Sequence, residues 1–168
     1  MKRFTINQKK ALLTVHILFA SIMLGVMVTF LVLSIAAATT DDPEVFQACY
    51  AVMLVLAGSS VRASTIGTVV TGVLLSVLTH WGLLKYYWII AKELLTVISI
   101  GIGMIGIYVW SLKAADLAGE AGWNALHNPE FLANRLYLVT GIICQLVSLA
   151  AMFGLSVYKP WGKRGSVA

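Results

Sequence analysis

The chain has 168 residues, of which 60% are hydrophobic and only 11% are charged. A soluble domain carries about 25% charged residues, so this chain has too few polar side chains to cover a water-soluble globule. Its composition excludes an ordinary cytosolic enzyme, a disordered chain and a disulfide-rich secreted module, and it indicates a membrane protein. The net charge of +5 does not indicate nucleic-acid binding, because the basic residues flank apolar runs instead of forming a patch.

The first apolar run contains no charged residue between positions 11 and 38. As a helix these 28 residues would extend about 42 Å, against roughly 30 Å for the hydrocarbon core of a bilayer. A signal peptide is the alternative, because four basic residues precede the run and three alanines end it at positions 36–38. The apolar region of a signal peptide has only about 7–15 residues, so we interpret 11–38 as a first membrane span.

The second apolar stretch begins with Asp41-Asp42-Pro43-Glu44, which is typical of a helix N-terminus. It continues to Thr79 and is about twice as long as one span requires. Gly58-Ser59-Ser60, followed by Arg62, divides it. We therefore expect an outer interfacial helical segment at 43–57 and a second span at 60–80. One continuous kinked helix is the alternative.

An aromatic cluster between Trp81 and Trp88 indicates a tight connection at the membrane interface. We expect a third span at about 84–112, an outer loop at 113–134 and a fourth span at about 135–158. Within that loop, Asn128-Pro129-Glu130 has the pattern of a helix start. The predicted fold is all-α: a single transmembrane domain, 1–168, that forms a bundle of four membrane-spanning helices.

The basic residues predict the orientation of the chain. Three of them, Arg62, Lys113 and Arg135, fall on one side of the predicted bundle. The opposite side collects eight: Lys2, Arg3, Lys9, Lys10, Lys85, Lys159, Lys163 and Arg164. By the positive-inside rule both termini face the cytoplasm, so we expect a multi-pass protein of a bacterial cytoplasmic membrane.

Small residues recur at helical spacing in three of the predicted spans. They are Ser21, Gly25 and Thr29; Ser60, Ser64, Thr68, Gly72 and Ser76; and Ser99, Gly103 and Gly106. Such faces let the backbones of neighbouring helices approach closely. We expect them to pack within the bundle; a homodimer or another membrane protein partner is the alternative. The lipid bilayer itself is the other expected partner.

Glu93 and Lys92 are the two charged residues that the predicted spans leave at membrane depth. Ionisable residues there are functional candidates because their burial is costly. Glu93 needs a partner, which His16, His80, Lys85 or Lys92 could supply in a structural ion pair. A proton-coupled transporter that uses Glu93 is the functional alternative. Near the middle of the fourth span, we expect the Gln145 amide to make an interhelical hydrogen bond.

His16 and His80 are predicted on adjacent antiparallel spans near one interface. Two such histidines could bind haem b through their imidazoles. Copper is a further possibility, because His16, Met23 and Met27 share one helical stripe and thioethers suit Cu(I). His16 and Met23 would lie about 10 Å apart along the axis, so they cannot bind one ion together. The metal, if any, is not specified by the sequence.

The sequence contains no nucleophile–base pairing, HExxH motif, phosphate-binding loop or paired carboxylates that would indicate catalysis. We therefore expect a non-enzymatic scaffold, accessory or stress-related membrane protein. The alternative is a haem- or metal-binding bundle with ligands near the cytoplasmic interface. A proton-coupled transporter is the third possibility.

Residues 71–97 resemble the second-to-third-span region of a family of bacterial four-helix integral membrane proteins without an assigned activity. The match is carried by Thr71-Gly72, Trp81-Gly82-Leu83, and Tyr87-Trp88 followed by Lys92. His16 followed by Gly25 in the first span is also similar to that family. More remotely, the chain is similar to the transmembrane domain of copper-resistance D-type proteins. The resemblance implies a compact four-span bundle in a bacterial cytoplasmic membrane, and it favours copper or haem slightly.

Overall fold

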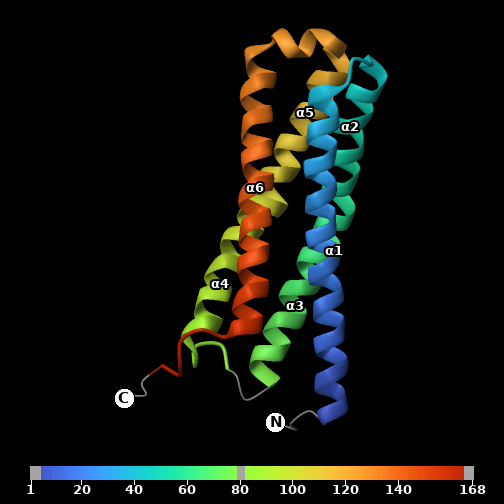
Figure 1. The fold of residues 1–168 in the computed structure, drawn as a ribbon. Helices are drawn as coiled ribbons and strands as arrows, with labels where there is room; N and C mark the ends of the chain where they lie inside the picture. Colours follow the sequence, from blue (N-terminus) through green and yellow to red (C-terminus); the bar gives the residue numbers. More distant parts are fainter. Residues whose placement is uncertain (1–4, 79–81, 165–168) are drawn as a thin grey trace.

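The computed structural model describes residues 5–78 and 82–164, which fold into an up-and-down helical bundle (Figure 1). Within those residues four helical runs are long and apolar enough to cross a membrane, and no strand is present. The first is α1 (Ile6–Thr39) and the last is α6 (Pro129–Tyr158). The predicted all-α fold with four spans is therefore confirmed.

The second run is one continuous helix, Pro43–Leu78. It consists of α2 (Pro43–Leu56), a π-helical turn η1 (Ala57–Val61) and α3 (Arg62–Leu78). The predicted division into an outer segment at 43–57 and a span at 60–80 is wrong, and the continuous-helix alternative holds. In an apolar solvent the chain cannot leave backbone groups unpaired. The Ser59 hydroxyl donates to the Val55 carbonyl at 2.6 Å, which satisfies one carbonyl at the turn.

The third run, Tyr87–His127, also continues beyond its predicted end. It contains α4 (Tyr87–Ile100), a second π-helical turn η2 (Gly101–Ile107), α5 (Tyr108–Ala121) and a short 3₁₀ helix η3 (Gly122–His127). Most of the predicted outer loop at 113–134 is therefore helical, and the fourth helix begins at Pro129, as the Asn128-Pro129-Glu130 pattern predicts, six residues before the predicted span at 135. Residues 113–121 are rich in alanine and other good helix formers, which explains the continuation.

Helix starts follow the predicted capping signals. The Asp42 side chain accepts a hydrogen bond from the Glu44 N–H at 2.8 Å, and Pro43 occupies the first turn of α2. The Asn128 side chain likewise accepts a hydrogen bond from the Glu130 N–H at 2.9 Å, and Pro129 occupies the first turn of α6. These caps fix the two connections at one end of the bundle.

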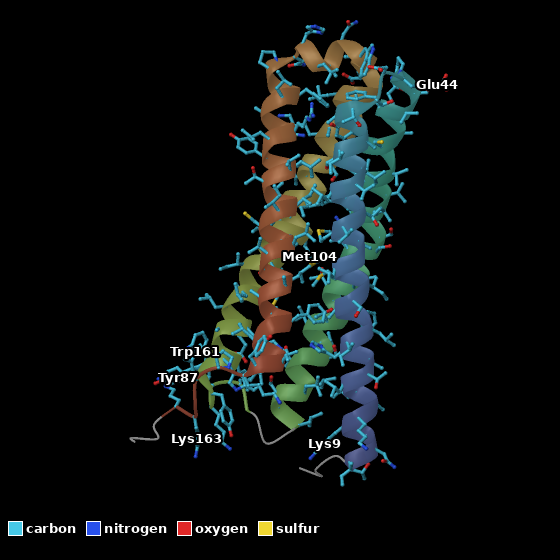
Figure 2. The ribbon with its side chains drawn as sticks, in the orientation of Figure 1. Lys9, Glu44, Tyr87, Met104, Trp161 and Lys163 are labelled. Atoms are coloured by element: carbon cyan, nitrogen blue, oxygen red, sulfur yellow. The ribbon has the colours of Figure 1, made fainter. Side chains whose placement is uncertain are left out.

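The two ends of the bundle carry opposite charge. We call the end where α1 begins and α6 ends the basic end; Lys9 and Lys163 mark it in Figure 2. The acidic end lies opposite and carries Glu44 (Figure 2). Six of the seven acids belong to it: Asp41, Asp42, Glu44, Asp116, Glu120 and Glu130.

The hydrophobic core lies toward the acidic end, where α2 packs on α1 and α5, and α6 packs on α1 and α5. Aromatic rings dominate it: Phe46 lies 5.2 Å from Tyr50, 5.3 Å from Trp123 and 5.8 Å from Phe131 between ring centroids. Rings at these separations attract each other beyond the effect of burial alone. Toward the basic end, α3 packs mainly on α1, and α4 packs on α6.

Candidate functional site

The basic half of the bundle runs from the basic end to η1 and η2; its helix α4 buries Trp88, Ile89 and Ser99, whereas α1 and α3 bury few large side chains there. Helix α1, which begins at Ile6, has no buried residue before Met23. Helix α3 buries Ser64, Thr65 and Thr71, and none of its large apolar side chains. Every sequence-predicted site residue that the structure describes belongs to the basic half or to its border with η2. This half therefore holds the candidate site.

His16 projects from α1 onto α3. Its Nδ1 lies 2.9 Å from the Thr71 Oγ1. The single Thr71 hydroxyl proton is directed at the Gly67 carbonyl, 2.6 Å away, so Thr71 accepts from His16. In the neutral tautomer that this arrangement favours, Nδ1 carries the ring proton and Nε2 carries the lone pair; the ring also hydrogen-bonds to the backbone of Thr68.

A glycine makes room for this imidazole. A Cβ at Gly72 would lie 3.3 Å from the His16 Cε1, closer than most real Cβ contacts. The predicted small-residue face of the second span thus contacts His16 at Gly72. Helices α1 and α3 also approach closely at Gly67, five residues earlier, where a Cβ would lie 2.5 Å from the Phe19 ring. Gly67 is not part of the predicted face.

The small-residue face of α1 behaves differently from its prediction. Ser21, Gly25 and Thr29 are all exposed, and no neighbouring atom lies within 4 Å of a Cβ built at Gly25. The expectation that this face packs within the bundle is therefore wrong. Met23, Met27 and Phe30 fill the buried side of α1 instead. On the third span the prediction holds, because Ser99 and Gly103 are buried.

Lys92 lies on α4 and reaches across to α6. Its ammonium donates to the Ser156 Oγ at 2.7 Å and lies 5.9 Å from the centre of the Trp88 ring. The charge of Lys92 is close enough to His16 for the two groups to interact electrostatically. The fold thus brings a cation from the third span near the imidazole of the first.

Glu93 is half-buried on α4, one residue beyond Lys92. Adjacent residues on a helix point in different directions, so the two side chains do not face each other. The Glu93 Oε1 is buried and has no hydrogen-bond partner within the described part of the chain. The one salt bridge there joins Lys113 and Glu130 at 2.6 Å near the acidic end. The expected ion pair of Glu93 with His16, Lys85 or Lys92 is thus not formed.

Gln145 is 2% exposed on α6 and packs against η2, where a Cβ at Gly103 would lie 3.3 Å from its Nε2. Its Oε1 has no hydrogen-bond partner among the described residues. In that part of the chain the predicted interhelical hydrogen bond of Gln145 is thus not accepted by this oxygen. Next to it, the Ser99 and Ser148 hydroxyls are 2.9 Å apart and link α4 to α6.

Arg62, which the sequence reasoning placed at the outer end of the second span, lies near the middle of a helix long and apolar enough to cross a membrane. It is the twentieth residue of the 36-residue helix Pro43–Leu78, about 2 Å from the middle of that helix along its axis. Its guanidinium lies 4.0 Å from the centre of the Tyr108 ring, so a cation–π contact joins the second and third spans beside η1 and η2. In the sequence, the position of Arg62 within a continuous apolar stretch could have indicated that it lies inside the second helix.

Two predicted ligands remain to be placed. His80 lies outside the described residues. Met23 is buried on α1, and its sulfur accepts a hydrogen bond from Thr65 at 3.3 Å. Across residues 5–78 and 82–164 no group of three or more His, Cys, Asp or Glu side chains is arranged to hold a metal ion.

Comparisons with protein-family models, with curated proteins and with solved structures give no match. His16, Lys92 and Glu93, with the groups around them, are therefore the features from which a function can be inferred.

Proposed function

We propose that this protein is a membrane haem protein in which the His16 Nε2 is an axial ligand of a b-type haem. The observation that carries the proposal is the 2.9 Å contact between the His16 Nδ1 and the Thr71 Oγ1. A histidine that binds a metal through one nitrogen nearly always donates a hydrogen bond from the other. Thr71 is held in the accepting orientation by its own bond to Gly67.

The surroundings of His16 suit the rest of a haem. The macrocycle is apolar and carries two carboxylates. Lys92, whose charge interacts with His16, could pair with one of these carboxylates. Contacts between α3 and α4 are few, and the basic half lacks the aromatic core of the acidic half. A cofactor held between these helices would therefore displace few packed side chains. When bound, the iron would supply one-electron redox chemistry.

A visible spectrum tests the proposal. The protein is produced with haem supplied, purified in mild detergent, and its Soret absorption and iron content are measured. We expect a Soret band that is lost in His16→Ala and kept in His127→Ala, which alters an exposed histidine of η3 near the acidic end. Thr71→Val should weaken haem retention without abolishing it, because it removes only the partner of Nδ1.

A colourless wild-type protein, or an equal Soret band in His16→Ala, would overturn the haem proposal. The protein would then fit the expectation of a non-enzymatic scaffold or accessory protein.

We further propose that the basic end faces the cytoplasm of a bacterial cell. The clustering of Lys9, Lys10, Lys85, Lys163 and other basic residues at this end supports the proposal. Single cysteines at Gln8 and Asn124, in a chain with Cys49 and Cys144 replaced by alanine, test it. A membrane-impermeant thiol reagent added outside intact cells should label Asn124→Cys and leave Gln8→Cys unlabelled; the reverse pattern would contradict the orientation.

A second candidate function is supported by the Glu93 Oε1, which is buried and has no hydrogen-bond partner among the described residues. A carboxyl group at membrane depth that lacks an ion-pair partner can gain and lose a proton during transport. In liposomes that contain a pH-sensitive dye, wild-type protein should then carry protons and Glu93→Gln should not. Equal flux in both proteins would exclude this role for Glu93.

A further inference from the structure

An apolar groove lies on the outward face of α4 at the basic end. Tyr87, Ile90, Ala91 and Leu94 line it on one side, and Trp161 closes it on the other. Figure 2 shows Tyr87 and Trp161 close together, with Lys163 below them. The groove is shallow and open to the outside, with a volume of about 410 Å³ and an almost entirely apolar lining. It is therefore suited to a hydrocarbon chain.

The chain after α6 is folded back to form this groove. Lys159 ends α6 in the left-handed conformation with φ 46°, and Trp161 follows with φ 65°. A left-handed conformation is rare for a bulky residue such as tryptophan and is kept only where the surrounding structure enforces it. Here the Arg164 N–H donates to the Lys85 carbonyl at 2.9 Å, and Lys163 pairs with Tyr86 in an isolated β-bridge. These contacts hold the Trp161 indole beside α4.

Basic residues occur in both chain segments that flank the groove. Lys159, Lys163 and Arg164 come from the segment after α6, and Lys85 comes from the connection before α4. The charged side chains of 82–92 and 154–164 are all basic, and Glu93 follows directly on α4. Tryptophan and tyrosine side chains favour the headgroup layer of a bilayer, which is the level at which lipid phosphates lie.

We propose that this groove binds an anionic phospholipid, with one acyl chain along α4 and its phosphate beside the cations of the C-terminal segment. Basic pockets beside membrane helices bind acidic headgroups, and each lysine or arginine contributes about 1 kcal/mol near an anionic membrane surface. A second copy of the chain is a poorer occupant. A symmetric contact through this groove would bring the basic residues of both copies together, and like charges across an interface oppose binding.

Fluorescence quenching by lipids brominated on their acyl chains tests the proposal. The full chain is placed in phosphatidylcholine vesicles with a minor fraction of brominated phosphatidylglycerol or, separately, brominated phosphatidylcholine. The contribution of Trp161 is the difference between the wild-type protein and Trp161→Phe. We expect this contribution to be quenched at a lower content of the anionic lipid than of the zwitterionic one.

Charge variants make the test specific. Removing one cation with Lys163→Gln should reduce the preference for the anionic lipid about fivefold, and adding Arg164→Gln should reduce it further. The matched control is Lys9→Gln with Lys10→Gln. It removes two cations of the basic end that lie on α1, away from the groove (Figure 2), and should leave the preference unchanged.

Equal quenching of Trp161 by both lipids would overturn the proposal, and so would an equal loss of preference in the control variant. Absence of quenching by either lipid, together with dimers in detergent that Trp161→Phe dissociates, would assign the groove to a second copy. None of these outcomes depends on whether haem is bound at His16.

Discussion

The packing of α1 on α3 gives the sharpest prediction about stability. At Gly67 an added methyl group would lie 2.5 Å from two carbons of the Phe19 ring. One of them is Cγ, at the base of the ring, so rotating the ring cannot relieve the overlap. Gly67→Ala should therefore force α1 and α3 apart. These two helices also carry His16 and Thr71.

The size of the effect follows from two opposing contributions. Overpacking a well-packed contact costs about 1–3 kcal/mol of unfolding free energy. Replacing glycine by alanine in a helix contributes about 1 kcal/mol of stability. Gly25→Ala on α1 gains only the stabilising contribution of alanine, because no neighbouring atom lies within 4 Å of a Cβ built at Gly25. Gly67→Ala should therefore be less stable than Gly25→Ala by about 1–3 kcal/mol.

Reversible unfolding in mixed micelles, followed by circular dichroism, measures this difference. Phe19→Leu combined with Gly67→Ala should recover part of the lost stability, because the smaller side chain leaves space for the new methyl group. Equal stabilities for Gly67→Ala and Gly25→Ala would refute the packing described for α1 and α3.

Three further variants can be measured in the same unfolding assay. Tyr108→Leu removes the ring beneath the Arg62 guanidinium and should lower the free energy of unfolding by about 0.5–2 kcal/mol. Tyr158→Leu, which changes an 84% exposed side chain, should lower it little. Equal losses in the two variants would contradict the cation–π contact. Glu93→Gln should not destabilise the protein, because the buried Oε1 has no partner in the described chain; a loss of about 3–5 kcal/mol would instead indicate a buried ion pair. Lys113→Gln should lower the free energy of unfolding by less than about 1 kcal/mol, because the side chains of Lys113 and Glu130 are 44% and 59% exposed. A larger loss would contradict the expectation that an exposed salt bridge contributes little stability.

The sequence alone predicts the number of spans and the signals that start the helices. Both kinds of information are local: apolar run length, and the Asp-Pro-Glu and Asn-Pro-Glu patterns at Asp42 and Asn128. A cap acts within one helical turn, so its residues predict it without knowledge of the rest of the fold.

The Gly58-Ser59-Ser60 stretch shows where local reasoning fails. In water this composition is typical of a break between two segments. Within an apolar bundle, an interrupted helix would leave carbonyl and N–H groups unpaired, and the π-helical turn η1 keeps them bonded instead. Arg62 was placed at the outer end of the second span for the same reason, and its position near the middle of the helix follows once the helix is continuous.

The direction in which a helix face points is a property of the whole bundle. The sequence identifies small residues on α1, but packing turns Met23, Met27 and Phe30 inward and leaves Gly25 exposed. His16 was predicted as a ligand without its partner Thr71, because the register of α1 against α3 is set by Gly67 and Gly72. The sequence therefore predicted which residues form the candidate site, but it did not predict the hydrogen bonds between them.

The central claim is that His16 presents a free Nε2 to a haem within the membrane. It is tested most directly by titrating haem into the purified protein in lipid nanodiscs and following the Soret maximum. We predict saturable binding by the wild-type protein and by His127→Ala, and an affinity lower by more than about tenfold for His16→Ala. The same titration curve for all three proteins would contradict the claim.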